Sequence, residues 1–291
     1  MTEQMRRTQF ACLYRGALAV IVALVVARLA VELAGMPPAY SRYFSSSVGV
    51  LFVAIYLAAV GPLRGGLQKF SELLLPAVVL AAWTQVWVIL ATVIAAVFHL
   101  RRSHFALKED FGNWGHLGRH VLGHVIAIGP FFVVVLILMA LVRVLWRWPV
   151  TVAPGAFLGV FVIMRFWTEV IGLSAFRTAA WSSTLLVLLS GFYLGGIGVR
   201  MGLGSARQLL VPSLVVAWAW RAWVYLATVL SALVPAFRTH FFNPSAGPVV
   251  LQLLRALAQA LIEGLIVGML LWGIAVWMAH ATRPAASAEA S

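Results

Sequence analysis

Residues 16–36 read GALAVIVALVVARLAVELAGM, and this stretch decides the fold class. A transmembrane helix needs about 20 mostly apolar residues, and this run is apolar apart from Arg28 and Glu32. Seven more such runs follow along the chain, at 47–63, 75–99, 121–145, 152–173, 182–199, 211–235 and 250–279. The sequence therefore predicts an all-α integral membrane protein with about eight transmembrane helices.

The composition excludes a soluble globular fold. Hydrophobic residues make up 63% of the 291 positions and charged residues only 10%, whereas a soluble chain has about 25% charged residues. The formal net charge of +13 lies in short loops, which is typical of the positive-inside rule rather than of nucleic-acid binding. The lipid bilayer is the predicted partner, and no nucleic acid is expected.

The basic residues also predict an orientation. If the N-terminus lies inside, the inner side collects most of the loop arginines, while the outer loop after residue 99 offsets its basic residues with Glu109 and Asp110. Both termini are therefore expected in the cytoplasm. Only Lys69 and Lys108 among the 21 basic residues are lysines, which suggests a GC-rich coding sequence. We expect a bacterial cytoplasmic (inner) membrane.

The second half of the chain repeats the first. Arg28-Leu-Ala-Val-Glu32-Leu-Ala-Gly35 recurs 137 residues later as Arg165-Phe-Trp-Thr-Glu169-Val-Ile-Gly172. After one deletion the spacing is 136, and the segment 87–93 recurs as 223–229. So many rare residues in the same order indicate a duplication.

Each repeat holds four spans, so both copies share one orientation and form parallel repeats. We predict a cytoplasmic N-terminal segment, two four-helix membrane repeats and a disordered tail, at 1–15, 16–149, 150–283 and 284–291. The stretches 64–76 and 200–212 are predicted to be interfacial turns or short helices, with plain loops as the alternative. Each closes at a proline, Pro76 or Pro212, where the next span is expected to begin.

The two Arg-x3-Glu pairs are the first candidate site. Charges inside a membrane are costly and persist when they are paired or face a cavity. Arg28 and Glu32 share one helical face, and so do Arg165 and Glu169. One interpretation is a pair of structural ion pairs. The other is a polar pathway, in which the arginines attract an anion or carboxylate and the glutamates act as proton or cation partners.

Other charges within the spans occur in only one copy. Arg221 lies in the seventh span, and Arg255 and Glu263 lie in the eighth. Glu263 begins a small-xxx-small pattern through Gly264 and Gly268 that permits close helix contact. Glu263 is either a protonated or hydrogen-bonded residue in a packing seam, or a group that carries a proton or contacts a cation. We include Arg221 and Glu263 in the predicted pathway.

Three histidines, His116, His120 and His124, form the second candidate site. Their spacing of four places the imidazoles on one helical face, and imidazole is a ligand for divalent metals and haem iron. The segment lacks HExxH and other specific metal motifs. Because glycines surround these residues, the helix is expected to start only near His120. Ordinary interfacial histidines are the alternative.

Function is predicted from these features and from what the sequence lacks. It contains no phosphate loop, no dinucleotide fingerprint and no nucleophile elbow. The favoured interpretation is a transporter, channel or permease subunit with a polar site near the repeat interface. One alternative is a haem-binding or metal-binding membrane protein or enzyme that uses the histidines. Another is a structural or assembly subunit that docks a partner membrane subunit or forms a homo-oligomer. A non-enzymatic role is favoured.

Overall fold

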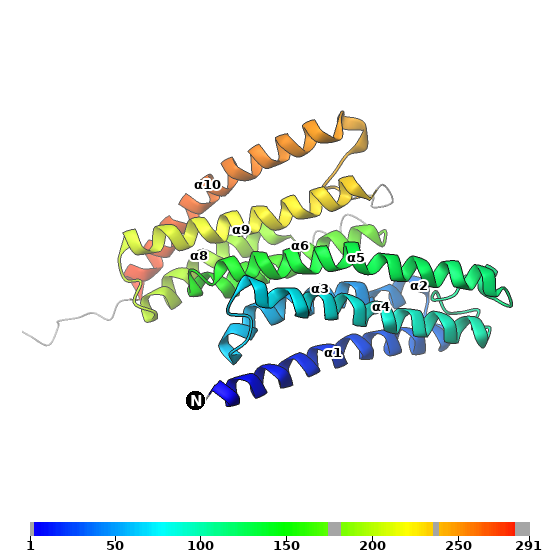
Figure 1. The fold of residues 1–291 in the computed structure, drawn as a ribbon. Coiled ribbons are helices and arrows are strands. Elements are labelled where there is room, and N and C mark those ends of the chain that lie inside the picture. Colours follow the sequence, from blue (N-terminus) through cyan, green and yellow to red (C-terminus); the bar gives the residue numbers. More distant parts are fainter. Residues whose placement is uncertain (1–2, 174–181, 235–238, 283–291) are drawn as a thin grey trace, which may run out of the picture. The chain divides into compact units, whose positions relative to one another are not determined.

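The computed structural model describes residues 3–173, 182–234 and 239–282, and these residues form a helical protein (Figure 1). Within these ranges, eight helices are long and apolar enough to cross a membrane. The prediction of an all-α multi-pass membrane protein is therefore confirmed, and the lipid bilayer is its environment. The predicted tail, 284–291, lies outside the described residues.

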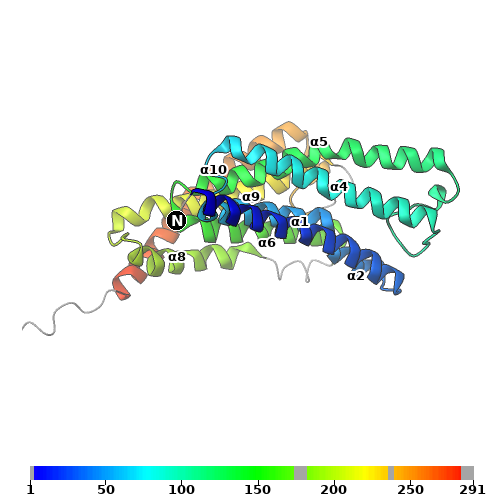
Figure 2. The same cartoon turned by 60° about the horizontal axis from the view of Figure 1, so that its bottom comes forward.

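The chain divides into two compact units, Met1–Arg143 and Val144–Ser291. In the first unit, α1 packs on α3 and α4, and the short α2 contacts α1. Figure 2 shows α2 at the C-terminal end of α1. The helices of this unit are α1 (Glu3–Leu33), α2 (Pro38–Ser41), α3 (Ser46–Val60), α4 (Leu74–Val97) and α5 (Trp114–Leu145), with short 3-10 turns at Arg42–Phe44, Gly61–Arg64, Phe70–Leu73 and Lys108–Asp110.

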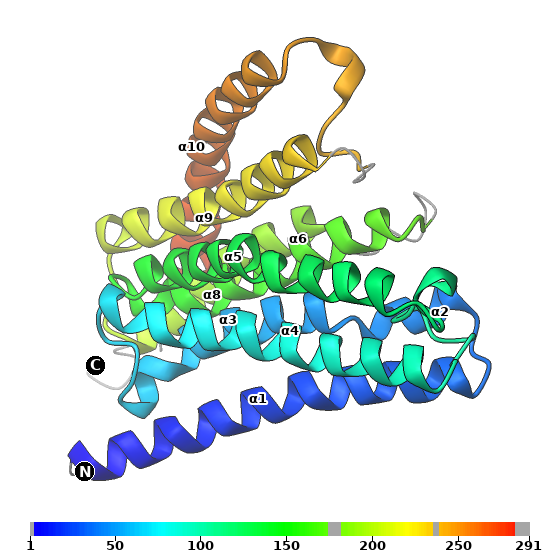
Figure 3. The same cartoon turned by 45° about the vertical axis from the view of Figure 1, so that its right-hand side comes forward.

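The second unit has its most extensive contact between α9 and α10, while α8 packs on α10 and α6 packs on α9. Figures 1 and 3 both show α10 diverging from α9 toward the end where α10 begins. The described helices of this unit are α6 (Val152–Val170), α8 (Ser183–Arg200), α9 (Ala206–Leu233) and α10 (Val249–Ala281), with 3-10 turns at Pro149–Thr151 and Pro244–Ala246.

Two expected helix starts were wrong. The helix α5 begins at Trp114 rather than near His120, because Asn113 Oδ1 accepts the backbone N–H of His116 at 3.0 Å and satisfies a donor of the first turn. The helix α9 begins at Ala206, where the Ser205 hydroxyl accepts the N–H of Gln208 at 3.2 Å. Pro212 therefore lies inside α9 and does not begin the span.

Small residues let the helices of the second unit approach closely. On α8, an added Cβ at Gly195 would lie 2.5 Å from the backbone oxygen of Ala275 on α10. On α10, an added Cβ at Gly264 would lie 2.1 Å from Trp218 of α9. The predicted Gly264-x3-Gly268 pattern is thus part of a glycine-lined contact, as is common between membrane helices.

We expect Gly195→Ala to destabilise the second unit, because the backbone of α10 cannot yield as a flexible side chain would. Overpacking of this kind costs about 1–3 kcal/mol. The adjacent Gly196→Ala is a matched control, since an added Cβ there meets nothing within 4 Å. Thermal unfolding in detergent should show a lower midpoint for the first variant only. Equal midpoints for both variants would contradict the close approach of α8 and α10.

Candidate functional site

The carboxylate of Glu32 is the centre of a buried polar cluster in the first unit. Arg28 Nε lies 3.2 Å from Glu32 Oε1, so the predicted pair forms. The Ser41 hydroxyl also donates to Oε1, at 2.9 Å. His104 donates its backbone N–H to Oε2 at 3.0 Å, and its Nδ1 lies 2.8 Å from the same oxygen. Glu32 is only 4% exposed, and both of its oxygens have partners.

Glu169 has corresponding partners in the second unit. Arg165 Nε lies 3.3 Å from Glu169 Oε1. His240 donates its backbone N–H to Oε2 at 2.9 Å, and its Nδ1 lies 2.6 Å from that oxygen. Each carboxylate therefore joins the helix that carries it to a loop about 70 residues further along the chain.

Each cluster lies where its helix ends. Gly35 and Gly172 follow α1 and α6 with φ values of +89° and +81°, a left-handed conformation that glycine adopts at helix C-termini. The C-terminus of a helix carries partial negative charge, which is unfavourable for a carboxylate in the last turn. The arginine and histidine partners of Glu32 and Glu169 offset this repulsion.

Phe105 anchors the first of these loops. Its ring centroid lies 4.1 Å from that of His104, and the residue is 5% exposed within a hydrophobic cluster that includes Val25, Ala91 and Leu117. In the second loop the rings of His240 and Phe241 are 3.9 Å apart. Hydrogen bonds to a glutamate and an adjacent aromatic ring thus hold each loop in place.

Sequence reasoning missed both glutamate-binding histidines as members of these clusters. The available signal was the spacing of 136 residues, because Arg102-Ser-His104-Phe105 recurs as Arg238-Thr-His240-Phe241. The first loop is longer than the second, which hid the match beyond residue 229. The position Arg238 lies outside the described residues.

The histidines on α5 bind other partners. Asp110 places its two carboxylate oxygens 2.6 Å from His116 Nδ1 and 2.8 Å from His120 Nδ1, and accepts the N–H of Leu107 at 2.7 Å. His124 Nδ1 lies 3.1 Å from Gln85 Oε1 on α4. In the part of the chain that the structure describes, no group of three or more His, Cys, Asp or Glu is arranged to hold a metal ion. The metal or haem assignment stays a prediction.

The electrostatics of Asp110 follow from these contacts. Burial raises the pKa of this carboxyl, but the hydrogen bonds from His116, Leu107 and His120 outweigh burial and hold the pKa below its ordinary value. Asp110 is therefore a carboxylate at neutral pH, and it ties the loop before α5 to the first turns of that helix.

Arg221 and Glu263 form an ion pair between α9 and α10. Arg221 Nη1 lies 2.7 Å from Glu263 Oε2, and the side-chain amide of Gln259 donates to the other carboxylate oxygen. The guanidinium also lies over the ring of Trp220, 5.1 Å from its centroid. Its Nε is buried and has no hydrogen-bond partner among the described residues.

A cavity of about 240 Å³ joins this ion pair to the Glu169 cluster. Its walls come from three segments of the second unit. They are Arg221, Val224, Tyr225 and Thr228 on α9, His240 and Phe241 in the loop, and Ala256, Gln259 and Ala260 on α10. At about 30 Å³ for each water molecule, the cavity has room for a solute of several non-hydrogen atoms.

The predicted pathway residues thus fall into separate groups. Arg28 and Glu32 belong to a closed cluster in the first unit, with each glutamate oxygen occupied. Arg165 and Glu169 reach the cavity through His240, and Arg221 lines it with Glu263 as its ion partner. The second unit therefore combines predicted charges with a polar cavity.

Replacing Asp110 should release the loop before α5. We expect Asp110→Asn to lower the free energy of unfolding by about 2 kcal/mol, because the buried site loses charge-assisted hydrogen bonds. The depressed pKa means that this stabilisation is present above the ordinary pKa of an aspartate and is lost as pH falls through the lower folded value. Glu109→Gln is the control in the same turn. A thermal midpoint at pH 7.5 that is equal for both variants would contradict the role of Asp110.

The His104 loop should loosen in mild acid. Burial lowers the pKa of His104, the hydrogen bond with Glu32 raises it less, and the charge of Arg28 lowers it further. The docked loop therefore keeps its full stability above the ordinary histidine pKa of about 6.5 and loses it as pH falls below that value.

Hydrogen exchange of residues 103–106 measures this effect. After correction for intrinsic rates, we expect faster exchange at pH 5.5 than at pH 7.5 in the wild type. His104→Gln should remove the pH dependence, because glutamine does not titrate. Equal protection of the wild-type loop at both pH values would show that protonation of His104 does not oppose docking.

Comparisons with protein-family models, with curated proteins and with solved structures give no match for this chain. Its function is therefore inferred from the residues and contacts described above.

Proposed function

We propose that this protein is a membrane transport protein, acting as a carrier, channel or permease subunit, and that its second unit binds a small anion. The supporting observation is the cavity that Arg221 lines. The Nε–H of the same guanidinium is buried and lacks a partner among the described residues. Buried donors are nearly always hydrogen-bonded. A bound acceptor within the cavity would be a partner for the guanidinium donors that the ion pair with Glu263 leaves over.

Among the described residues that line the cavity, the charged side chain is the guanidinium of Arg221, and a cation at the wall favours an anion. Glu263 neutralises Arg221 from one side through Nη1, and Gln259 holds the carboxylate in place. A guanidinium carries five N–H donors, so donors remain after this ion pair has formed. His240 and Thr228 add polar groups to the wall, while Phe241 and Ala260 form apolar parts of it. Ionisable residues within a membrane span are functional candidates by default.

We also propose that the two units are parallel copies, with only the second carrying the binding site. The matched clusters around Glu32 and Glu169 support the duplication. At the spacing of 136 residues, Arg221 stands where the first unit has Gln85, which contacts His124 instead. A neutral contact and an ion pair thus occupy corresponding places between α4 and α5 and between α9 and α10.

The proposal includes the orientation predicted from the loop charges. Both termini lie in the cytoplasm of a bacterial inner membrane, so the His104 and His240 loops lie on the outer side. The cavity then lies toward the outer ends of α9 and α10, where a solute from outside would first meet the protein. A pocket at this depth suits entry of a small anion better than binding of a large cofactor.

Reconstitution tests the proposal. Purified protein in liposomes should take up at least one of formate, acetate, lactate, chloride and inorganic phosphate faster than protein-free liposomes. Arg221→Gln should reduce this uptake at least tenfold, because a tenfold change corresponds to about 1.4 kcal/mol and loss of a charged hydrogen bond costs more.

Arg255→Gln is the matched control, since Arg255 is an exposed arginine on α10 outside the cavity. Its uptake should equal that of the wild type. The proposal fails if the folded wild type moves none of the five anions, or if the two arginine variants transport equally well.

A further inference from the structure

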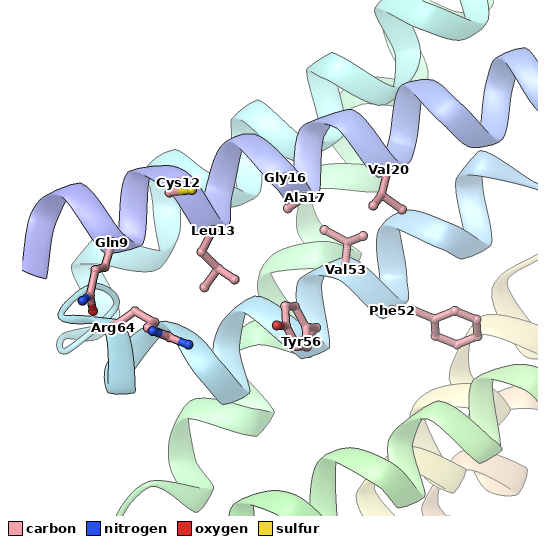
Figure 4. A pocket seen from close by; sticks show the side chains of 10 residues that line it. All are labelled: Gln9, Cys12, Leu13, Gly16, Ala17, Val20, Phe52, Val53, Tyr56 and Arg64. Carbon is pink, nitrogen blue, oxygen red and sulfur yellow. The ribbon is translucent and has the colours of Figure 1, made fainter.

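We propose that a groove between α1 and α3 binds an anionic phospholipid, with an acyl chain along the groove and the phosphate at Arg64. This site lies in the first unit and is independent of the transport proposal. The groove has a volume of about 630 Å³. Its apolar walls include Leu13 and Val20 on α1 and Phe52 on α3, and Figure 4 shows Leu13 and Val20 reaching from α1 toward α3.

Small residues on α1 make room for the chain. Gly16 and Ala17 face the groove, and an added Cβ at Gly16 would meet nothing within 4 Å. A lipid chain is the natural occupant of an apolar groove on a helix that crosses a bilayer, because water there would find few polar partners. The residues at the other end of the groove indicate that this lipid is a phospholipid.

That end is basic and polar. Figure 4 shows Gln9 and Arg64 together at one end of the groove, with Tyr56 pointing between the two helices. The side chain of Arg64 is exposed and forms no ion pair or hydrogen bond with another described residue. The planar guanidinium suits bidentate binding of a phosphate. Arg64 also lies on the side predicted to be cytoplasmic, where anionic headgroups attract basic residues.

The second unit has a related but narrower groove between α6 and α8, of about 390 Å³. Its lining residues Ala153, Phe157 and Tyr193 stand 137 positions after Gly16, Val20 and Tyr56. Phe157 is bulkier than Val20, and no arginine lines this second groove. The two grooves therefore lie at corresponding positions on different helix pairs. Of these two, the first has the larger volume and the basic end.

Native mass spectrometry of the intact protein tests this site. Both phosphatidylglycerol and phosphatidylcholine offer a phosphate to Arg64, but the quaternary ammonium of choline is repelled by the guanidinium. With the two lipids of matched chains added separately, we therefore expect one phosphatidylglycerol to bind about tenfold more tightly. Arg64→Gln should abolish this preference while still allowing a lipid to bind. Arg207→Gln, an exposed arginine that lines neither groove, should retain it.

A second variant tests the groove itself. Val20→Phe narrows it as Phe157 narrows the other groove, and we expect it to weaken binding of both lipids. Glycerol phosphate at the same concentration should not displace the lipid, since it lacks the acyl chain. Equal wild-type affinity for the two lipids, an equal loss of preference in Arg64→Gln and Arg207→Gln, unchanged binding in Val20→Phe, or displacement by glycerol phosphate would each overturn the proposal.

Discussion

A carboxylate within a membrane helix has to be neutralised and hydrogen-bonded, because the bilayer offers it no water. Glu32 meets this requirement with an arginine on its own helix, a serine on α2 and a histidine from the loop after α4. The rest of this end of the first unit depends on this arrangement. It determines where α1 ends, where the loop docks and which ring enters the hydrophobic cluster beside it.

The carboxylate of Glu169 in the second unit also has to be neutralised and hydrogen-bonded, but here the loop that binds it lines a cavity. Glu169 holds the His240 loop through equivalent hydrogen bonds, and that loop then forms one wall of the cavity beside Arg221. The structural and the pathway interpretations of the Arg-x3-Glu pairs are therefore not exclusive here. A carboxylate that anchors a loop also positions the polar surface on which the proposed binding site depends.

Much of the fold could be predicted from the sequence, because the length of an apolar run is a local property. The eight spans were found in this way. The starts of α5 and α9 were wrong by several residues, since they depend on local capping contacts at Asn113 and Ser205. Glycines and prolines near those positions suggested later starts than the caps allow.

The charged residues of the candidate site could be predicted from the sequence, but the residues that bind them could not. Arg28, Glu32, Arg221 and Glu263 stood out because charge is rare in the spans. The bonds from His104 and His240 join residues more than 70 positions apart, and neither apolar periodicity nor local spacing reveals such contacts. The pairing of Arg221 with Glu263, and the cavity beside them, depend on how α9 packs against α10.

The correspondence between Gln85 and Arg221 has a consequence for how such a chain tolerates change. An amide facing an imidazole and a guanidinium facing a carboxylate occupy corresponding positions on helix pairs whose loops are held by corresponding glutamate clusters. Because the loop anchors are separate from these interhelical contacts, the polarity of one half can vary while its architecture is retained. Under the proposed duplication, one half can be retained as a scaffold while the other acquires chemistry.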